Sequence, residues 1–332
     1  MKELLKRTLF YGAGLFAWVG PLFELVRRFS GIDIFIPFYH IVSNDEVLHV
    51  KHLYRYKNVQ QFEADLDFFQ ENYQPIRFQQ LYDHVFDNKP LPKHPLLLTF
   101  DDGLREVYDV VVPILKAKGM PAVFFLCSGF IDNQALFHKH KASLILENSS
   151  YGEEKALGES LSSVKYSQHE SLDVLAEKSG LSFQEYLDTQ PLYMIRQQIA
   201  AILDDDLFAI GAHSIDHPEY PLIPLEEQIR QTRESTQFVR QTFDLDYSTF
   251  SMPFHDIDVS QDYFDAILGD DIVDISFGIE GTMQEDFDRN YHRHNMEGGS
   301  YPARNMAFVY YIVAILRRLL GTHRIRRSRL AV

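Results

Sequence analysis

Two adjacent carboxylates follow an apolar run near residue 100. The run Leu96–Phe100 has the nearly continuous apolar character of a strand buried on both faces, and it leads directly into Asp101, Asp102 and Gly103. The carboxyl end of such a strand is where α/β folds place their chemistry. Because two neighbouring carboxylates repel each other, a bound metal ion is the simplest compensation. A polar turn that ends a strand is the alternative interpretation.

Two histidines spaced four residues apart supply further candidate metal ligands. His213 and His217 flank the sequence Ser-Ile-Asp, and in a helical turn the side chains at i and i+4 lie on one face. One carboxylate and two imidazoles leave coordination positions open for water, as a catalytic zinc-type site requires. Together with the aspartates this spacing predicts a metal site, whereas the pair alone would also fit two surface histidines in a loop.

These two stretches together resemble the motifs of a known family. The sequence Thr-Phe-Asp-Asp-Gly at 99–103 and the sequence His-Ser-Ile-Asp-His at 213–217 are similar to the first two motifs of the polysaccharide deacetylases, also called carbohydrate esterase family 4 or the NodB-homology domain. Residues 112–126 resemble the helix and strand that follow the first motif, and residues 34–40 resemble the first strand. The resemblance covers roughly residues 32–298. It implies an α/β fold, a distorted parallel (β/α) barrel.

The resemblance also implies roles for individual residues. Asp101 would be the general base, and Asp102, His213 and His217 would bind one divalent metal ion, most often Zn²⁺. Ser214 would brace the second loop. The implied reaction hydrolyses a linear amide C–N bond, so that N-acetyl groups are removed from hexosamine residues of a glycan or of a lipid-linked sugar by a metal-activated water. A degenerate, non-catalytic carbohydrate-binding barrel is the alternative, and deacylation of non-sugar amides is a third interpretation.

The third motif of the family matches less closely. It reads Arg-x-Pro-Tyr/Phe, and the corresponding residues here are Ser-Met-Pro-Phe at 251–254. Ser251 therefore replaces the arginine that orients the base, and this replacement favours the non-catalytic alternative. Pro253 and Phe254 match the motif and are expected to contribute to the substrate site.

The general acid is expected near the end of the barrel sequence. The family's last motif is Leu-x-His, and its nearest counterpart lies within residues 290–295. In a strand, His292 and His294 share one face and Arg293 takes the other. We assign the acid to His294 and keep His292 as the alternative. His40, which ends the first predicted strand, is a further candidate for the substrate site or, equally, a hydrogen-bonded barrel residue.

Alternating apolar and amphipathic segments indicate βαβ units and a parallel barrel. The pattern divides the chain into an apolar N-terminal helix at 1–31, a barrel at 32–300 and an apolar, basic C-terminal helix and tail at 301–332. Residues 134–205 exceed one crossover and predict a helical insertion. Strands are predicted at 33–39, 95–100, 121–127, 207–212, 247–252 and 272–279, and helices at 59–72, 105–118, 171–178, 182–203 and 225–242.

Composition and charge exclude some classes of protein. The chain has 332 residues with 45% hydrophobic content, enough for a large core. Its single cysteine, Cys127, excludes an intramolecular disulfide. The net charge is −15, and it becomes −22 for residues 1–300 because residues 301–332 contain seven arginines and no acidic residue. An acidic body argues against nucleic acid as a partner.

Both ends of the chain are apolar and basic. Residues Thr8–Val26 are flanked by lysines and arginines but include Pro21 and Glu24, and Met306–Leu316 precedes the cluster Arg317–Arg329. Apolar segments beside arginines are typical of interfacial helices on an anionic membrane. We therefore expect a protein held on the cytoplasmic side of a membrane, peripherally or by its N-terminus. A soluble cytoplasmic protein with terminal helices packed on the barrel is the alternative.

Overall fold

Short apolar strands alternate with helices along most of the chain, and the strands assemble in one curved sheet. The computed structural model describes residue 10, residues 12–148 and residues 164–329. In this part of the chain, eight strands lie in the order β10-β1-β4-β5-β6-β7-β8-β9, and each neighbouring pair is parallel. The strands are β1 (Pro37–Tyr39), β4 (Leu98–Phe100), β5 (Ala122–Leu126), β6 (Phe208–Ala212), β7 (Thr249–Ser251), β8 (Ile275–Gly278), β9 (Asn290–His292) and β10 (His294–Asn295), while β2 (Gln74–Pro75) and β3 (Pro95–Leu96) form a separate parallel pair.

A single residue joins the two edges of this sheet. β9 pairs with β8, β10 pairs with β1, and only Arg293 separates β9 from β10. The first and last strands of the sheet are therefore consecutive pieces of one segment, and the sheet is a nearly closed parallel barrel. The predicted fold class, a distorted parallel (β/α) barrel, is confirmed.

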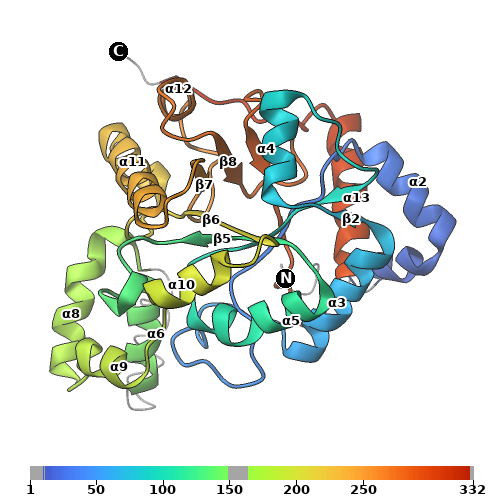
Figure 1. Cartoon of the computed structure of the whole chain (residues 1–332). Coiled ribbons are helices and arrows are strands. Elements are labelled where there is room, and N and C mark those ends of the chain that lie inside the picture. The colour runs from blue at the N-terminus through green and yellow to red at the C-terminus, as the bar shows by residue number, and fades with distance from the viewer. Residues whose placement is uncertain (1–9, 11, 149–163, 330–332) are drawn as a thin grey trace.

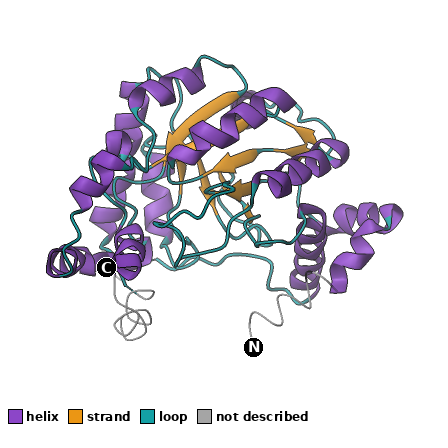
Figure 2. Cartoon of the chain, turned by 90° about the horizontal axis from the view of Figure 1, so that it is seen from below, coloured by secondary structure: helices purple, strands orange, loops and turns teal. Residues whose placement is uncertain are grey.

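Helices cover the outside of the barrel, whose strands lie at the centre of the molecule (Figure 2). Each helix buries an apolar face against the wall, as α3 does with Phe62, Leu66 and Phe69. α3 begins with a capping box in which the Asn58 side chain accepts a hydrogen bond from the Gln61 N–H. The helices around the barrel are α3 (Val59–Asn72), α4 (Phe78–Asp87), α5 (Val112–Lys118) preceded by the π-helical turn η3 (Val107–Val111), α10 (Arg196–Leu203), α11 (Leu225–Thr242), α12 (Gln261–Gly269) and α13 (Ala303–Leu319), with short 3₁₀ turns η4 (Ile131–Asn133), η5 (Tyr166–Gln168) and η6 (Tyr220–Leu222) in the connections.

The predicted helix at 182–203 is wrong because it is two helices. α9 (Phe183–Thr189) ends before Pro191, and α10 begins at Arg196. Between them the backbone turns back to the first motif, where the Arg105 N–H donates to the Leu192 carbonyl and the Met194 N–H donates to the Gly103 carbonyl. Proline cannot continue a helix, and these tertiary hydrogen bonds satisfy the backbone instead.

The described part of the segment predicted as an insertion, 134–205, is divided: its last helix, α10, belongs to the barrel, and the helices before it form a small group beside the barrel. α6 (His138–Asn148), α8 (His169–Lys178) and α9 lie together at one corner of the molecule (Figure 1). Their own apolar cluster includes Ile145, Leu172 and Ala176. The group extends beyond the barrel wall, next to the end of the sheet at which β5 and β6 finish.

The N-terminal apolar segment is divided into two pieces. The 3₁₀ turn η2 (Ala13–Trp18) is followed by α2 (Gly20–Ser30), which has Pro21 in its first turn. Since proline lacks an N–H group, one helix cannot run through this point without losing a hydrogen bond. Among the described residues, none of the helices combines the length and the apolar character that crossing a bilayer requires. Thr8, the start of the predicted segment, lies outside the described residues.

The C-terminal arginines do not form one free cluster. Arg327 lies 2.6 Å from Asp256 and 2.5 Å from Glu285, Arg324 lies 2.8 Å from Asp286, and Arg329 lies 2.9 Å from Asp262 and Asp265. These three arginines tie the tail to the barrel. Acidic residues of the barrel therefore neutralise this half of the predicted basic cluster.

Candidate active site

The three predicted metal ligands, Asp102, His213 and His217, meet at the carboxyl ends of β4 and β6. Oδ1 of Asp102 lies 3.3 Å from Nε2 of His217 and 3.6 Å from Nε2 of His213. All three side chains are buried, and the potential ligand atoms lie within 4.8 Å of one another. Because parallel strands end at the same edge of the sheet, residues far apart in the sequence converge here.

A strained loop, rather than a helical turn, brings the two histidines together. Residues 213–217 follow β6 without helical structure. Ser214 and His217 have positive φ values of 70° and 59°, and Asp102 has a φ of 70°. Such conformations cost energy in residues other than glycine, and they concentrate at functional sites. The Ser214 Oγ accepts a hydrogen bond from the His217 N–H at 2.9 Å, so Ser214 braces the loop.

The environment of these residues fits a divalent metal ion. Oδ1 of Asp102 is buried and has no hydrogen-bond partner among the described residues. Nδ1 of His213 lies 2.8 Å from the Ser251 carbonyl oxygen and can donate to it, which leaves Nε2 as the free ligand atom. Burial lowers the pKa of His213 to about 4, although the charge of Asp101 opposes this shift. His213 is therefore neutral at physiological pH, as a metal ligand must be.

The second carboxylate, Asp101, is held by a buried arginine. Arg293 donates from Nη1 to Oδ1 of Asp101 at 2.7 Å and from Nη2 to Oδ2 at 2.8 Å. The guanidinium is fully buried, and its carbon lies 4.7 Å from the ring centre of Phe38 and 5.4 Å from that of Phe125. Burial alone would raise the pKa of Asp101, but the charge and hydrogen bonds of Arg293 outweigh it and lower that pKa.

A second ion pair places a histidine beside the aspartates. Oε1 of Glu297 accepts hydrogen bonds from the backbone N–H groups of His40 and Ile41, and its Oε2 lies 2.6 Å from Nδ1 of His40. Burial by itself lowers the pKa of His40, but the charge and hydrogen bond of Glu297 outweigh it and raise that pKa to about 10. His40 is therefore a cation at neutral pH.

His40, the two aspartates and the two histidines of the loop after β6 line one cavity of about 330 Å³. The hydroxyl of Tyr54 is buried there without a hydrogen-bond partner among the described residues, so it is available to a ligand. A groove of about 1140 Å³ adjoins the cavity and shares His40, Tyr54 and Asn295 with it. The cavity is lined by Phe38, His40, His52, Leu53, Tyr54, Asp101, Asp102, Phe137, Lys139, His213, His217, Met252, Phe254, Ile279 and Asn295.

The polysaccharide deacetylase family model matches residues 88–267, which is more than half of the chain. The chain belongs to the polysaccharide deacetylase family. A poly-beta-1,6-N-acetyl-D-glucosamine N-deacetylase of Escherichia coli (strain K12) is 38% identical over 66 residues, which make up 20% of this chain and 10% of that protein. This chain thus matches about a tenth of the length of its curated relative.

Several solved structures share the fold of this chain. IcaB from Ammonifex degensii has a TM-score of 0.55 at 17% sequence identity, and the match covers 84% of this chain and 98% of that one. The Streptococcus pyogenes deacetylase PplD has a TM-score of 0.55 at 13% identity, with 87% and 97% covered. The shared fold therefore covers nearly all of each solved chain and most of this chain.

In this member of the polysaccharide deacetylase family, the structure does not bring His294 to the cavity. Its ring stacks on Phe35 at 4.4 Å and lies 5.1 Å from Tyr310, between the barrel wall and the helices outside it. Asp101 is instead contacted by Arg293, which was predicted to lie on the opposite face of the same segment. Alternation along 290–295 is present, but the arginine faces the barrel interior.

Two residues of the site were missed from the sequence. Arg293 is 192 residues from Asp101, and Glu297 is 257 residues from His40. One signal in the sequence was available. Because Ser251 replaces the arginine of the third motif, another cation had to neutralise Asp101. Of the third-motif residues, Phe254 lines the cavity, whereas Pro253 is not among its lining residues. The Ser251 carbonyl oxygen is the partner of Nδ1 of His213, and the Ser251 Oγ lies 3.4 Å from Oδ1 of Asp101.

A second group of potential metal ligands already contains a cation from the chain. Asp256, Glu285 and His292 offer ligand atoms within 4.8 Å of one another. The guanidinium of Arg327 contacts both carboxylates and offsets part of their negative charge. This cluster is therefore a structural ion-pair network that fastens the C-terminal tail, and it explains the burial of His292.

Proposed function

We propose that this polysaccharide deacetylase removes N-acetyl groups from hexosamine residues of a glycan in a metal-dependent hydrolysis. The observation that carries the proposal is the pairing of an ionised carboxylate, Asp101, with the cluster of Asp102, His213 and His217 in one cavity. The E. coli relative, a poly-beta-1,6-N-acetyl-D-glucosamine N-deacetylase, supports the same reaction class. The metal would be Zn²⁺ or another divalent transition metal.

Asp102, His213 and His217 would hold the metal ion. A divalent ion bound by three such ligands, with an open position, supplies Lewis-acid activation of water and of an amide carbonyl. The orphaned Oδ1 of Asp102 and the free Nε2 atoms of the two histidines give the protein a preformed set of donors. The proposal therefore needs no rearrangement of the described residues.

Asp101 would act as the general base. A carboxylate has about four lone-pair positions, and the two hydrogen bonds from Arg293 leave others open to accept a proton from the attacking water. Arg293 holds the carboxylate in one orientation and keeps it ionised. In the resembled family the third-motif arginine orients the base, and here Arg293 would do so in its place.

His40 would act as the general acid that protonates the leaving amine. It lines the same cavity as Asp101, it carries a proton at neutral pH, and Glu297 fixes the Nδ1 side of its ring. The ring therefore presents Nε2 as its remaining donor. This proposal replaces the assignment of the acid to His294, whose ring is packed against Phe35.

The shape of the site suits a glycan rather than a small amide. The catalytic cavity falls within the usual size range of small-molecule sites and carries aromatic rings from Tyr54, Phe137 and Phe254. The adjoining groove, lined by Arg55, Tyr301 and other residues, offers room for neighbouring sugar units. Incubation of metal-loaded protein with N-acetylglucosamine oligomers should release acetate, and the absence of acetate would favour the non-catalytic barrel.

Metal content tests the ligand assignment without reference to activity. We expect wild-type protein to bind one divalent ion per chain, and His213→Ala and His217→Ala to lose it. Changes outside the ligand set already cost about 10–100-fold in metal affinity, so removal of a direct ligand should cost more. His84→Ala, on α4, is the matched control and should retain the ion. Equal metal content in all four proteins, measured by elemental analysis, would contradict the assignment.

The identity of the acid is tested with two leaving groups. His40→Gln should slow hydrolysis of the amide about 10²-fold and that of an activated ester much less, because the ester leaving group needs little protonation. His294→Ala is the control and should leave the amide-to-ester ratio unchanged.

The pH profile gives an independent check on His40. Since Glu297 raises the pKa of His40 to about 10, amide turnover should persist until the pH rises through that value. Glu297→Gln removes the raising interaction, and burial then lowers the pKa of His40, so the alkaline loss of activity should move to lower pH. A profile that is identical in the two proteins would exclude His40 as the acid.

A further inference from the structure

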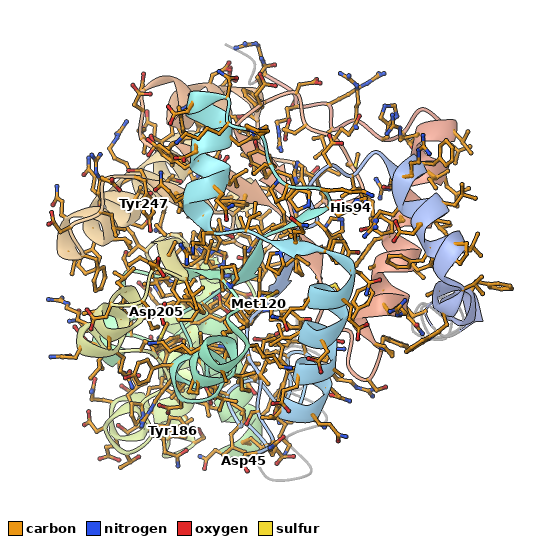
Figure 3. The ribbon with its side chains drawn as sticks, turned by 45° about the vertical axis from the view of Figure 1, so that its right-hand side comes forward. Asp45, His94, Met120, Tyr186, Asp205 and Tyr247 are labelled. Atoms are coloured by element: carbon orange, nitrogen blue, oxygen red, sulfur yellow. The ribbon has the colours of Figure 1, made fainter. Side chains whose placement is uncertain are left out.

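Exposed apolar side chains gather on one side of the molecule. Trp18 is 65% exposed, Phe29 is 62% exposed and Leu319 is 78% exposed. They belong to η2, α2 and the end of α13, which form the outer edge of the protein in Figures 1 and 3. We call the whole set the apolar patch: Phe16, Trp18, Val19, Leu25, Phe29, Leu316, Leu319 and Leu320.

The elements that carry the patch, η2, α2 and α13, pack side by side and run in the same direction. Gly14 lies against Asn305 near the start of α13, and Gly31 lies against Arg318 near its end. α2 buries Phe23, Arg27 and Ser30 against the protein and leaves its other face in solvent. Leu25 and Phe29, spaced by one helical turn, lie on that outer face. A large exposed apolar area of this kind marks an interaction surface.

Unpaired positive charges border the patch. Arg28 in the last turn of α2 and Arg317 and Arg318 in the last turn of α13 form no ion pair with the described residues. They differ from Arg324, Arg327 and Arg329, which acidic residues of the barrel neutralise. Arg27 on the inner face is also paired, with Glu24.

We propose that the apolar patch, together with Arg28, Arg317 and Arg318, docks the protein on the surface of an anionic lipid bilayer. Phenylalanine, leucine and tryptophan beside arginines match the interfacial region of such a membrane, where apolar tails and anionic head groups meet. The chain has a net charge of −15, so the positive charge beside the patch favours an approach with this face toward the lipid. A second copy fits less well, because two such patches would place arginines against arginines.

Vesicle binding tests the proposal directly. We expect full-length protein to float with vesicles of phosphatidylcholine and phosphatidylglycerol at low salt, and to float much less with phosphatidylcholine alone or at high salt. Trp18 is the sole tryptophan of the chain, so its fluorescence reports on the patch. It should shift to shorter wavelength and become protected from an aqueous quencher when the anionic vesicles are added.

Matched variants separate docking from a general charge effect. Each basic residue near an anionic surface contributes about a fivefold factor to partitioning, so Arg28→Glu/Arg318→Glu should weaken binding by more than about 25-fold. Lys178→Glu/Arg233→Glu changes two exposed basic residues elsewhere and should weaken binding far less. Leu25→Ser/Phe29→Ser should lower binding while metal content stays unchanged, which shows that the site remains folded.

Three outcomes would overturn the proposal. The first is full-length protein that stays in solution with anionic vesicles at low salt. The second is an equal loss of binding in the patch and control variants. The third is a Trp18 spectrum that depends on protein concentration and not on lipid, which would assign the patch to contact between copies of the chain.

Discussion

Replacement of Asp101 by asparagine is expected to reduce turnover by about 10²–10⁴-fold while the protein still binds its metal ion. Asparagine has nearly the same shape but cannot accept the proton of the attacking water. The proposed metal ligands Asp102, His213 and His217 are unchanged in this variant, so metal binding and turnover are measured separately. Acetate release and elemental analysis on the same preparation measure both quantities.

The interpretation depends on the stability of this variant. Asp101→Asn leaves the buried guanidinium of Arg293 without its anion, and such a loss is strongly destabilising. Urea unfolding must therefore show that the assayed protein is folded. Asp109→Asn, which changes an exposed aspartate on η3, is the control and should keep wild-type turnover. If folded, metal-loaded Asp101→Asn retained near wild-type activity, another group would have to be the base.

Replacement of Arg293 by methionine is expected to lower both the free energy of unfolding and the activity. Removing one partner of a buried ion pair costs about 3–5 kcal/mol, because the other charge stays buried without compensation. Asp101 would then be buried without its cation, and its pKa would rise. The unfolding free energy from urea titration and the pH dependence of acetate release measure the two effects.

The sign of the pH effect follows from the same interaction. In wild-type protein the lowered pKa of Asp101 gives stability that is present above the unfolded pKa of about 3.9 and is lost as pH falls through the folded value. In Arg293→Met that contribution disappears, and the acidic loss of activity should move to higher pH.

A double variant tests whether the two residues act as a pair. Asp101→Asn/Arg293→Met should be less destabilised than the sum of the single variants, because no charge is left unpaired. Arg233→Met, an exposed arginine on α11, is the control and should unfold like wild type. Additive losses would show that Arg293 stabilises the barrel through its packing against Phe38 and Phe125 rather than through Asp101.

The buried arginine also bears on the choice between an enzyme and a degenerate barrel. Ser251 in place of the third-motif arginine was the main reason for the non-catalytic alternative. Arg293, the residue between β9 and β10, places a guanidinium on Asp101, with both of its terminal nitrogens engaged. The substitution at Ser251 therefore does not leave the carboxylate without a cation, and the reason for that alternative is removed.

The sequence by itself predicted the parts of the site that depend on short stretches of chain. Asp101 and Asp102 directly follow β4, and His213 and His217 lie in one loop after β6. In a parallel sheet such strand ends meet at one edge, so residue type and position sufficed to predict their meeting. The fold class followed from the same alternation of strands and helices.

Only the tertiary structure decided which residues surround that core of the site. Period-two alternation separates Arg293 from His292 and His294, but it does not say which face of a strand points into the barrel. The pairing of β10 with β1, which closes the sheet, determines which face points inward. The contact between Glu297 and His40 has the same origin, since these residues are neighbours only because the two strands are.

At the two ends of the chain, too, the sequence alone did not determine which side chains are exposed at the surface and which charges are paired. An apolar segment beside arginines has one sequence pattern whether it packs on the barrel or faces a membrane. The tertiary structure divided the C-terminal arginines into two groups, because Asp256 and Glu285 lie within reach of Arg327, whereas no acidic partner among the described residues lies beside Arg317 or Arg318. Charge in the sequence is a sum over residues, but whether an individual charge is neutralised depends on what the fold places next to it.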